Sequence, residues 1–239
     1  MELCSVCGSH KKVCHVCGAE LHKHFDSFIV RAEIIYAIFM AWGYAASADA
    51  IIRAWSWAAS PLLVISTFVL IRFFFAPTRN LYTASLISEK HKRWRWVIFV
   101  LDFPLLIFHS FAYYTMCVAV MNGDKNAYRF FQWFVILLST NIVWLTSIAA
   151  RMRIVGRRRH FWTFIRWSVN NFISVLLFYI AISVLSGNCT EFFRVFFTKN
   201  LPLVISAGGH AYWIFFCIAF SNCIIDVIST ASDYLGFES

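Results

Sequence analysis

Charged residues are scarce in this sequence. Only 14% of its 239 residues are Asp, Glu, Lys or Arg, whereas an average soluble domain contains roughly 25%. This shortage argues against an ordinary soluble domain. Hydrophobic residues make up 60% of the chain and its mean hydropathy is +0.67. These values, together with several apolar runs near the length of a membrane crossing, are typical of a membrane protein.

The sequence also lacks the common motifs of catalysis. It contains no Ser-His-Asp order, no phosphate-binding glycine loop and no HExxH pattern. A cleavable signal peptide is not evident, because the first residues are polar and rich in cysteine. We therefore expect the N-terminal segment to belong to the mature protein. Because the catalytic motifs are missing, we favour a function other than catalysis.

Six apolar stretches are each long enough to cross about 30 Å of hydrocarbon at 1.5 Å per helical residue. They cover residues 27–47, 54–76, 96–120, 129–150, 161–186 and 202–230. Lipid offers the backbone no hydrogen-bond partners, so these stretches should be helices and not open strands. The predicted fold is all-α: a polytopic membrane domain of about six helices over residues 25–239, preceded by a small module in residues 1–24.

Basic residues concentrate on alternate connections between these stretches. Most of them lie in the N-terminal arm, in "APTRNLYTASLISEKHKRWRW" and in "RMRIVGRRRH". The positive-inside rule then predicts that both termini lie in the cytoplasm, beneath a plasma or inner membrane. The net charge of +9 is explained mainly by this topology, with anionic lipid headgroups as the expected partners. Nucleic acid is a weaker alternative for "GRRRH".

The N-terminal segment contains four cysteines in two CxxC pairs, "CSVCG" and "CHVCG". Each CxxC turn can direct two thiolates at one metal ion, and the glycine that follows permits a tight backbone there. Four sulfur ligands in a tetrahedron suit structural Zn²⁺, so the predicted ligands are Cys4, Cys7, Cys14 and Cys17. Because such a site has no open position, we do not expect catalytic zinc.

These residues, and only positions 4–17, resemble the short zinc-ribbon modules found at the head of many proteins. The resemblance implies a zinc-binding module that often contacts protein or nucleic acid. Two disulfides are an alternative, but they need an oxidising compartment. A redox CxxC is another, but it would need a βαβ context that is missing. An arm this short cannot bury a core, so metal would replace the core.

Six ionisable residues lie inside the apolar stretches or near their edges. They are Arg31, Glu33, Arg72, Asp102, Arg166 and Asp226. By helical rise they lie roughly 5–10 Å from the cytoplasmic surface. One hypothesis is a charge network lining a cavity or pore; the other is snorkelling arginines and ion pairs that hold helices together. Both predict that at least one of the three arginines contacts one of the three acids.

Other polar residues lie in the same apolar stretches. His109 and His210 are predicted at similar depth, about 18–21 Å from the cytoplasmic face. They could ligate haem, relay protons or simply hydrogen-bond another helix. The pairs Asn170-Asn171 and Ser221-Asn222 are predicted to form hydrogen bonds between helices.

Three hypotheses for function remain open from the sequence. The leading one is a non-enzymatic membrane protein, an oligomeric pore or sensor-effector in which the zinc ribbon is a docking module; it implies a homo-oligomer. The second is a membrane scaffold that recruits a soluble cytoplasmic protein. The third is a haem- or lipid-linked membrane enzyme that uses His109, His210 and Asp102.

Overall fold

The computed structural model describes residues 31, 34–45, 48–49, 60–72, 95–121, 127–154, 158–190 and 209–235. Within these residues the structure is helical, with no strand. The four cysteines of the predicted zinc ribbon and Glu33 lie outside the described residues.

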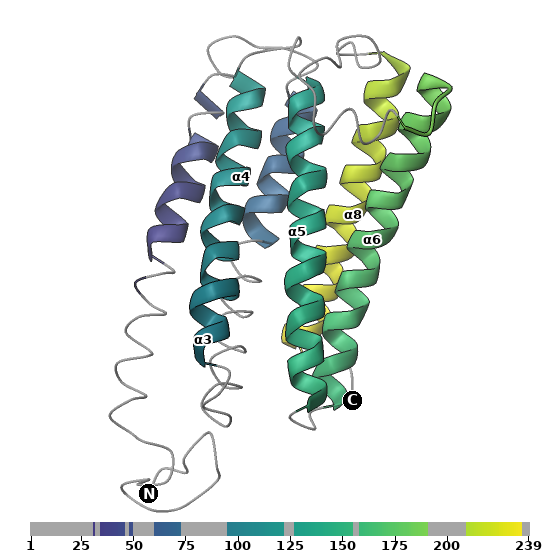
Figure 1. The fold of residues 1–239 in the computed structure, drawn as a ribbon. Coiled ribbons are helices and arrows are strands. Elements are labelled where there is room, and N and C mark those ends of the chain that lie inside the picture. The colour runs from purple at the N-terminus through teal and green to yellow at the C-terminus, as the bar shows by residue number, and fades with distance from the viewer. Residues whose placement is uncertain are drawn as a thin grey trace, which may run out of the picture.

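The longer helices run alternately up and down and lie side by side (Figure 1). In chain order they are α3 (Arg95–Val97), η2 (Ile98–Asp102), α4 (Phe103–Met121), α5 (Ala127–Ile154), α6 (Arg158–Ser186) and α8 (His210–Leu235). The segments α3, η2 and α4 follow one another without a break and form one continuous helix. Two shorter apolar helices, Ile34–Ala45 and Ser60–Arg72, precede them.

Four helices are long and apolar enough to cross a membrane: Ile98–Ala119, Ala127–Ile154, Phe161–Ser186 and His210–Ser229. The prediction of membrane-compatible helices is confirmed for these four. The Ile34–Ala45 and Ser60–Arg72 helices fall within the first two predicted stretches, but their described parts belong to a shorter class of 10–17 residues. The total of six crossings therefore remains a prediction.

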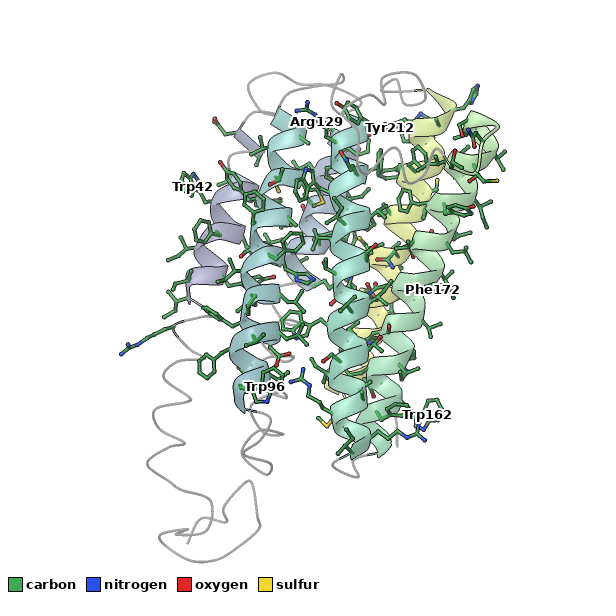
Figure 2. All side chains as sticks on the ribbon, viewed as in Figure 1. Trp42, Trp96, Arg129, Trp162, Phe172 and Tyr212 are labelled. Carbon is green, nitrogen blue, oxygen red and sulfur yellow. The ribbon has the colours of Figure 1, made fainter. Side chains whose placement is uncertain are left out.

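The outer surface of the bundle is apolar. Trp42, Trp96, Trp162 and Phe172 point away from the helices that carry them (Figure 2). A soluble protein seldom exposes so much contiguous apolar surface, because exposed hydrophobic groups cost free energy in water. Lipid is the solvent that suits this surface.

The two ends of the bundle contain different residues. We call the end where α5 finishes and α6 begins the basic end, because Arg151 and Arg153 lie in the last turn of α5. At the opposite end, the aromatic end, α5, α6 and α8 contact one another through an aromatic cluster of Phe131, Phe134, Phe178, Tyr212 and Phe215. Phe178 and Phe215 stack with ring centroids 5.5 Å apart. Rings packed in this way fill the interior without polar groups.

Candidate functional site

The carboxylate of Asp102, the last residue of η2, faces α5 near the basic end and has three hydrogen-bond donors. Arg151 donates from Nη1 to Asp102 Oδ2 at 2.7 Å and from Nη2 to Oδ1 at 2.6 Å. Trp144 Nε1 donates to the same Oδ1 at 2.8 Å. The Asp102 side chain is completely buried and that of Arg151 is 3% exposed. A two-pronged contact of this kind is the strongest form of Arg–carboxylate pair, so each charge compensates the other away from water.

A widened helical turn places Asp102 in this position. In η2 the Phe103 N–H bonds to the carbonyl of Ile98, five residues earlier instead of four. Pro104 follows directly; it has no N–H, and in a regular helix its ring would clash with the carbonyl four residues before it. The wider turn relieves that conflict, and it buries Ile98 and Asp102. Such π turns occur frequently at functional sites.

His109 continues the α4–α5 contact toward the middle of the bundle. Its Nδ1 lies 2.6 Å from the Leu105 carbonyl, and because a carbonyl only accepts, Nδ1 must carry the proton. Its Nε2 is 3.4 Å from Thr140 Oγ1, and its ring centroid is 5.4 Å from that of Trp144. This geometry is that of a histidine bridging two helices.

His210 is not part of this contact. It is the first residue of α8, at the aromatic end, and it is exposed. The structure does not bring His109 and His210 together, so the arrangement offers no support for paired ligation of haem or for an enzyme built on both residues.

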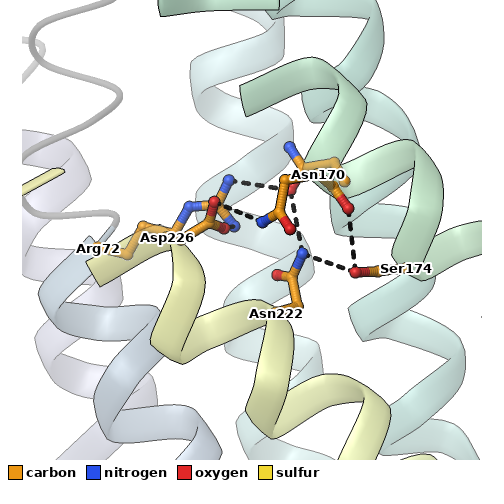
Figure 3. Close-up of polar contacts among 6 residues, drawn as sticks. Arg72, Asn170, Ser174, Asn222 and Asp226 are labelled. Carbon is orange, nitrogen blue, oxygen red and sulfur yellow. Dashed lines mark hydrogen bonds and ion pairs between the residues drawn. The ribbon is translucent and has the colours of Figure 1, made fainter. Parts of the chain in front are cut away.

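A second buried ion pair joins the Ser60–Arg72 helix to α8. Arg72 Nη1 lies 2.6 Å from Asp226 Oδ2, and the two side chains are 6% and 3% exposed. Asn170 and Asn171 of α6 each contact one member of the pair. Asn170 Nδ2 donates to Asp226 Oδ1 at 2.9 Å (Figure 3), and Arg72 Nη2 donates to Asn171 Oδ1 at 3.2 Å. One ion pair therefore connects three helices.

Two further polar residues extend this group along α6 and α8. Asn222 Nδ2 donates to Ser174 Oγ at 2.9 Å and lies 3.5 Å from Asn171 Oδ1. Ser174 Oγ in turn donates to the carbonyl of Asn170 at 3.1 Å. Ser174 follows Asn170 by four residues and Asp226 follows Asn222 by four, so each pair lies on one face of its helix. We call these six residues, shown in Figure 3, the Arg72 cluster: Arg72, Asn170, Asn171, Ser174, Asn222 and Asp226.

The Arg72–Asp226 contact is of the kind predicted from the sequence, and the prediction of interhelical hydrogen bonds holds for Asn170, Asn171 and Asn222. Ser221, in contrast, is exposed. The six predicted charges do not all meet inside the bundle: Arg31 and Arg166 are exposed. The described residues thus contain two separate buried ion pairs, and not one network of six residues.

Arg151 is the functional candidate that sequence analysis missed. The sequence places it in the basic "RMRIVGRRRH" stretch, which is predicted at the cytoplasmic surface, yet its side chain is buried. A signal was present, since Trp144, Ile148 and Arg151 recur at spacings of four and three residues and share one helical face. All three are buried. The buried face of α5 therefore continues beyond residue 150, where the predicted apolar stretch ends.

The described residues contain no group of three or more His, Cys, Asp or Glu side chains that could hold a metal ion. Their free cysteines are Cys117 and Cys223, which are buried, and Cys189 and Cys217, which are exposed. The predicted zinc ligands lie outside this part of the chain. Comparison with known proteins found no matching protein family, no matching curated protein and no matching solved structure.

Proposed function

We propose that this chain is a non-enzymatic integral membrane protein that self-associates into a pore, and that its N-terminal segment is a cytoplasmic zinc ribbon that receives the signal to open or close. The observation that carries the proposal is the presence of two buried ion pairs within otherwise apolar helices. Ionisable side chains are costly in a bilayer, and they are usually retained there for function.

The two ion pairs are suited to hold one arrangement of the helices. Asp102–Arg151 links η2 to α5, and Arg72–Asp226 links the Ser60–Arg72 helix to α8. Moving either helix away from its partner would leave a buried charge without compensation. A stimulus that favours the separated arrangement would therefore switch the bundle between two distinct states, and not deform it gradually.

The proposed orientation places the basic end toward the cytoplasm. Trp96 and Trp162 are exposed near that end (Figure 2), which suits an interfacial aromatic belt. Anionic lipid headgroups would contact the basic stretches beside them. The zinc ribbon, held by Cys4, Cys7, Cys14 and Cys17, would dock a soluble cytoplasmic protein or a neighbouring subunit.

The test is reconstitution of the purified full chain into liposomes. We expect a homo-oligomer, measured by mass in a native membrane mimetic, and a flux of small ions. Under conditions in which the less stable Asp102→Asn variant remains folded, it should change the flux or its ion selectivity while the oligomer mass is unchanged. Asp49→Asn is the matched control, since Asp49 is exposed and lies outside the two ion pairs.

A monomer with no flux under any ionic condition would contradict the pore. If that monomer also co-purified with a soluble protein in fixed ratio, and lost it when the zinc ribbon was deleted, the chain would be a membrane scaffold instead.

A further inference from the structure

The Arg72 cluster contains polar atoms without partners. Asn171 Nδ2 and Asn222 Oδ1 are buried and have no hydrogen-bond partner among the described residues. Asp226 Oδ2, in contrast, lies 2.6 Å from Arg72 Nη1 and is compensated by it. Buried polar groups in proteins are nearly always matched by protein or by a bound molecule.

The two amide groups cannot match these atoms by turning over. Asn171 Oδ1 already faces two donors, Arg72 Nη2 and Asn222 Nδ2. Turning it would bring an NH₂ group against both. Asn222 Nδ2 donates to Ser174 Oγ, whose own proton goes to the Asn170 carbonyl. Turning Asn222 would therefore place its oxygen against an oxygen that has no proton left to give. The unmatched atoms are a donor on Asn171 and an acceptor on Asn222.

These atoms specify the chemistry of what would bind there. A molecule that matches them must accept a hydrogen bond at Asn171 and donate one at Asn222. Arg72 and Asp226 compensate each other's charge, so a charged ligand would gain no net counter-charge there. The matching ligand is small, neutral and both a donor and an acceptor, as water is.

Aromatic rings lie between the cluster and the aromatic end of the bundle. Phe178 of α6 and Phe215 of α8 pack against each other and against Phe131 of α5, with ring centroids 5.5–6.3 Å apart. Packed rings exclude water and offer it few hydrogen bonds. We infer that the Arg72 cluster is a binding site for water, or for a small neutral solute of the same hydrogen-bonding chemistry. This inference depends on membrane insertion but not on the pore.

Two native cysteines report on the site without any substitution. Cys223 follows Asn222 directly in α8 and precedes Asp226 by three residues. Cys117 lies toward the aromatic end of α4. Both side chains are buried, at 1% and 0% exposure. Their solvent exposure is therefore matched, and only Cys223 adjoins the cluster.

The experiment is hydroxyl-radical footprinting of the full chain in lipid nanodiscs, with radicals generated from water by X-rays. Bound water beside a thiol supplies radicals locally, so Cys223 should oxidise about tenfold faster than Cys117. A second arm uses methyl methanethiosulfonate, a small neutral thiol reagent. Modification of Cys223 by both treatments would show that small solutes enter, whereas oxidation alone would show that only water does.

Equal and slow modification of the two thiols in both arms would overturn the inference. Asn222→Leu and Asn171→Leu, each checked for folding by size-exclusion chromatography, should abolish the preference for Cys223 if the unmatched amides hold the ligand. Persistence of the preference in both folded variants would likewise contradict this assignment. The wild-type comparison remains decisive if neither variant folds. Since footprinting measures no flux, its result is separate from the test of the pore.

Discussion

At the scale of single residues, Asp102 shows how an apolar helix can carry a charge. Its carboxylate receives two hydrogen bonds from Arg151 and one from Trp144, so burial leaves neither oxygen without a donor. The pair need not be more stabilising than apolar residues of the same volume would be. Its importance is that loss of one member leaves the other charge buried and uncompensated.

Asp102→Asn should therefore lower the free energy of unfolding by about 3–5 kcal/mol. Denaturant titration in a fixed detergent would measure this change. Asp49→Asn should have little effect in the same assay, because Asp49 is exposed. Combining Asp102→Arg with Arg151→Asp should recover part of the stability lost in either single variant. Equal stability of Asp102→Asn and wild type would show that the pair contributes nothing to the fold.

Trp144→Phe tests the third donor to the same carboxylate. The change removes a buried hydrogen bond of 2.8 Å and keeps most of the aromatic volume, so we expect a loss of about 1.5–3 kcal/mol. Trp162→Phe is the matched control, because Trp162 is 66% exposed on the outer surface. A larger effect for the control than for Trp144→Phe would contradict the role given to the indole N–H.

At the scale of helices, the η2 turn decides which residues of the continuous α3–η2–α4 helix face α5. A π turn contains one more residue than an α turn, so the chain before Pro104 is rotated relative to a regular helix by about 100°. That rotation brings Asp102 to the side of Arg151 and Trp144. The proline thus acts on the ion pair through the backbone, without touching either charge.

Pro104→Ala should allow the regular helix to continue and turn Asp102 away from Arg151. We expect it to lower stability even though alanine is the better helix former. The decisive measurement is the double variant: Pro104→Ala should cost much less in an Asp102→Asn background than in wild type, because the ion pair is already lost. Additive losses in the double variant would mean that the π turn and the ion pair are independent.

At the scale of the whole molecule, the two ends of the bundle have different interiors. The Asp102–Arg151 pair lies near the basic end, the Arg72 cluster lies nearer the middle of α6 and α8, and the aromatic cluster lies at the opposite end. In the proposed orientation the basic end faces the cytoplasm and the predicted zinc ribbon lies beneath it.

The zinc ribbon should bind about one zinc ion per chain. Elemental analysis of protein purified without chelator would measure this content, and Cys4→Ser combined with Cys7→Ser should abolish it. The matched control is Cys117→Ser, which changes a buried cysteine within α4. Wild-type protein without zinc would exclude the predicted site.

Orientation can be measured with the exposed Cys189, which follows the end of α6 at the aromatic end. An impermeant thiol reagent added outside intact cells should label it, because the positive-inside rule places the basic end in the cytoplasm. Cys189→Ser should remove the signal. Labelling of the four N-terminal cysteines from outside, after zinc removal in sealed cells, would reverse the proposed topology.

Sequence composition was enough to predict that the long apolar stretches are helices suited to a membrane, because in lipid the backbone of such a stretch has no other way to satisfy its hydrogen bonds. It predicted the helix at 129–150, which the structure extends to Ala127–Ile154. It also predicted interhelical hydrogen bonds at Asn170 and Asn171, since buried amides need partners wherever the helices lie.

The tertiary structure alone decided which charges meet. Asp102 pairs with Arg151, 49 residues away, and that choice depends on how two helices are rotated and shifted against each other. Local periodicity records which face of a helix is apolar, but not how far one helix slides along another. The π turn before Pro104 rotates Asp102 about the helix axis by the angle of one helical residue. A periodicity analysis that assumes a regular α-helix does not predict this rotation. For the same reason His109 and His210, predicted at similar depth, lie apart in the folded chain.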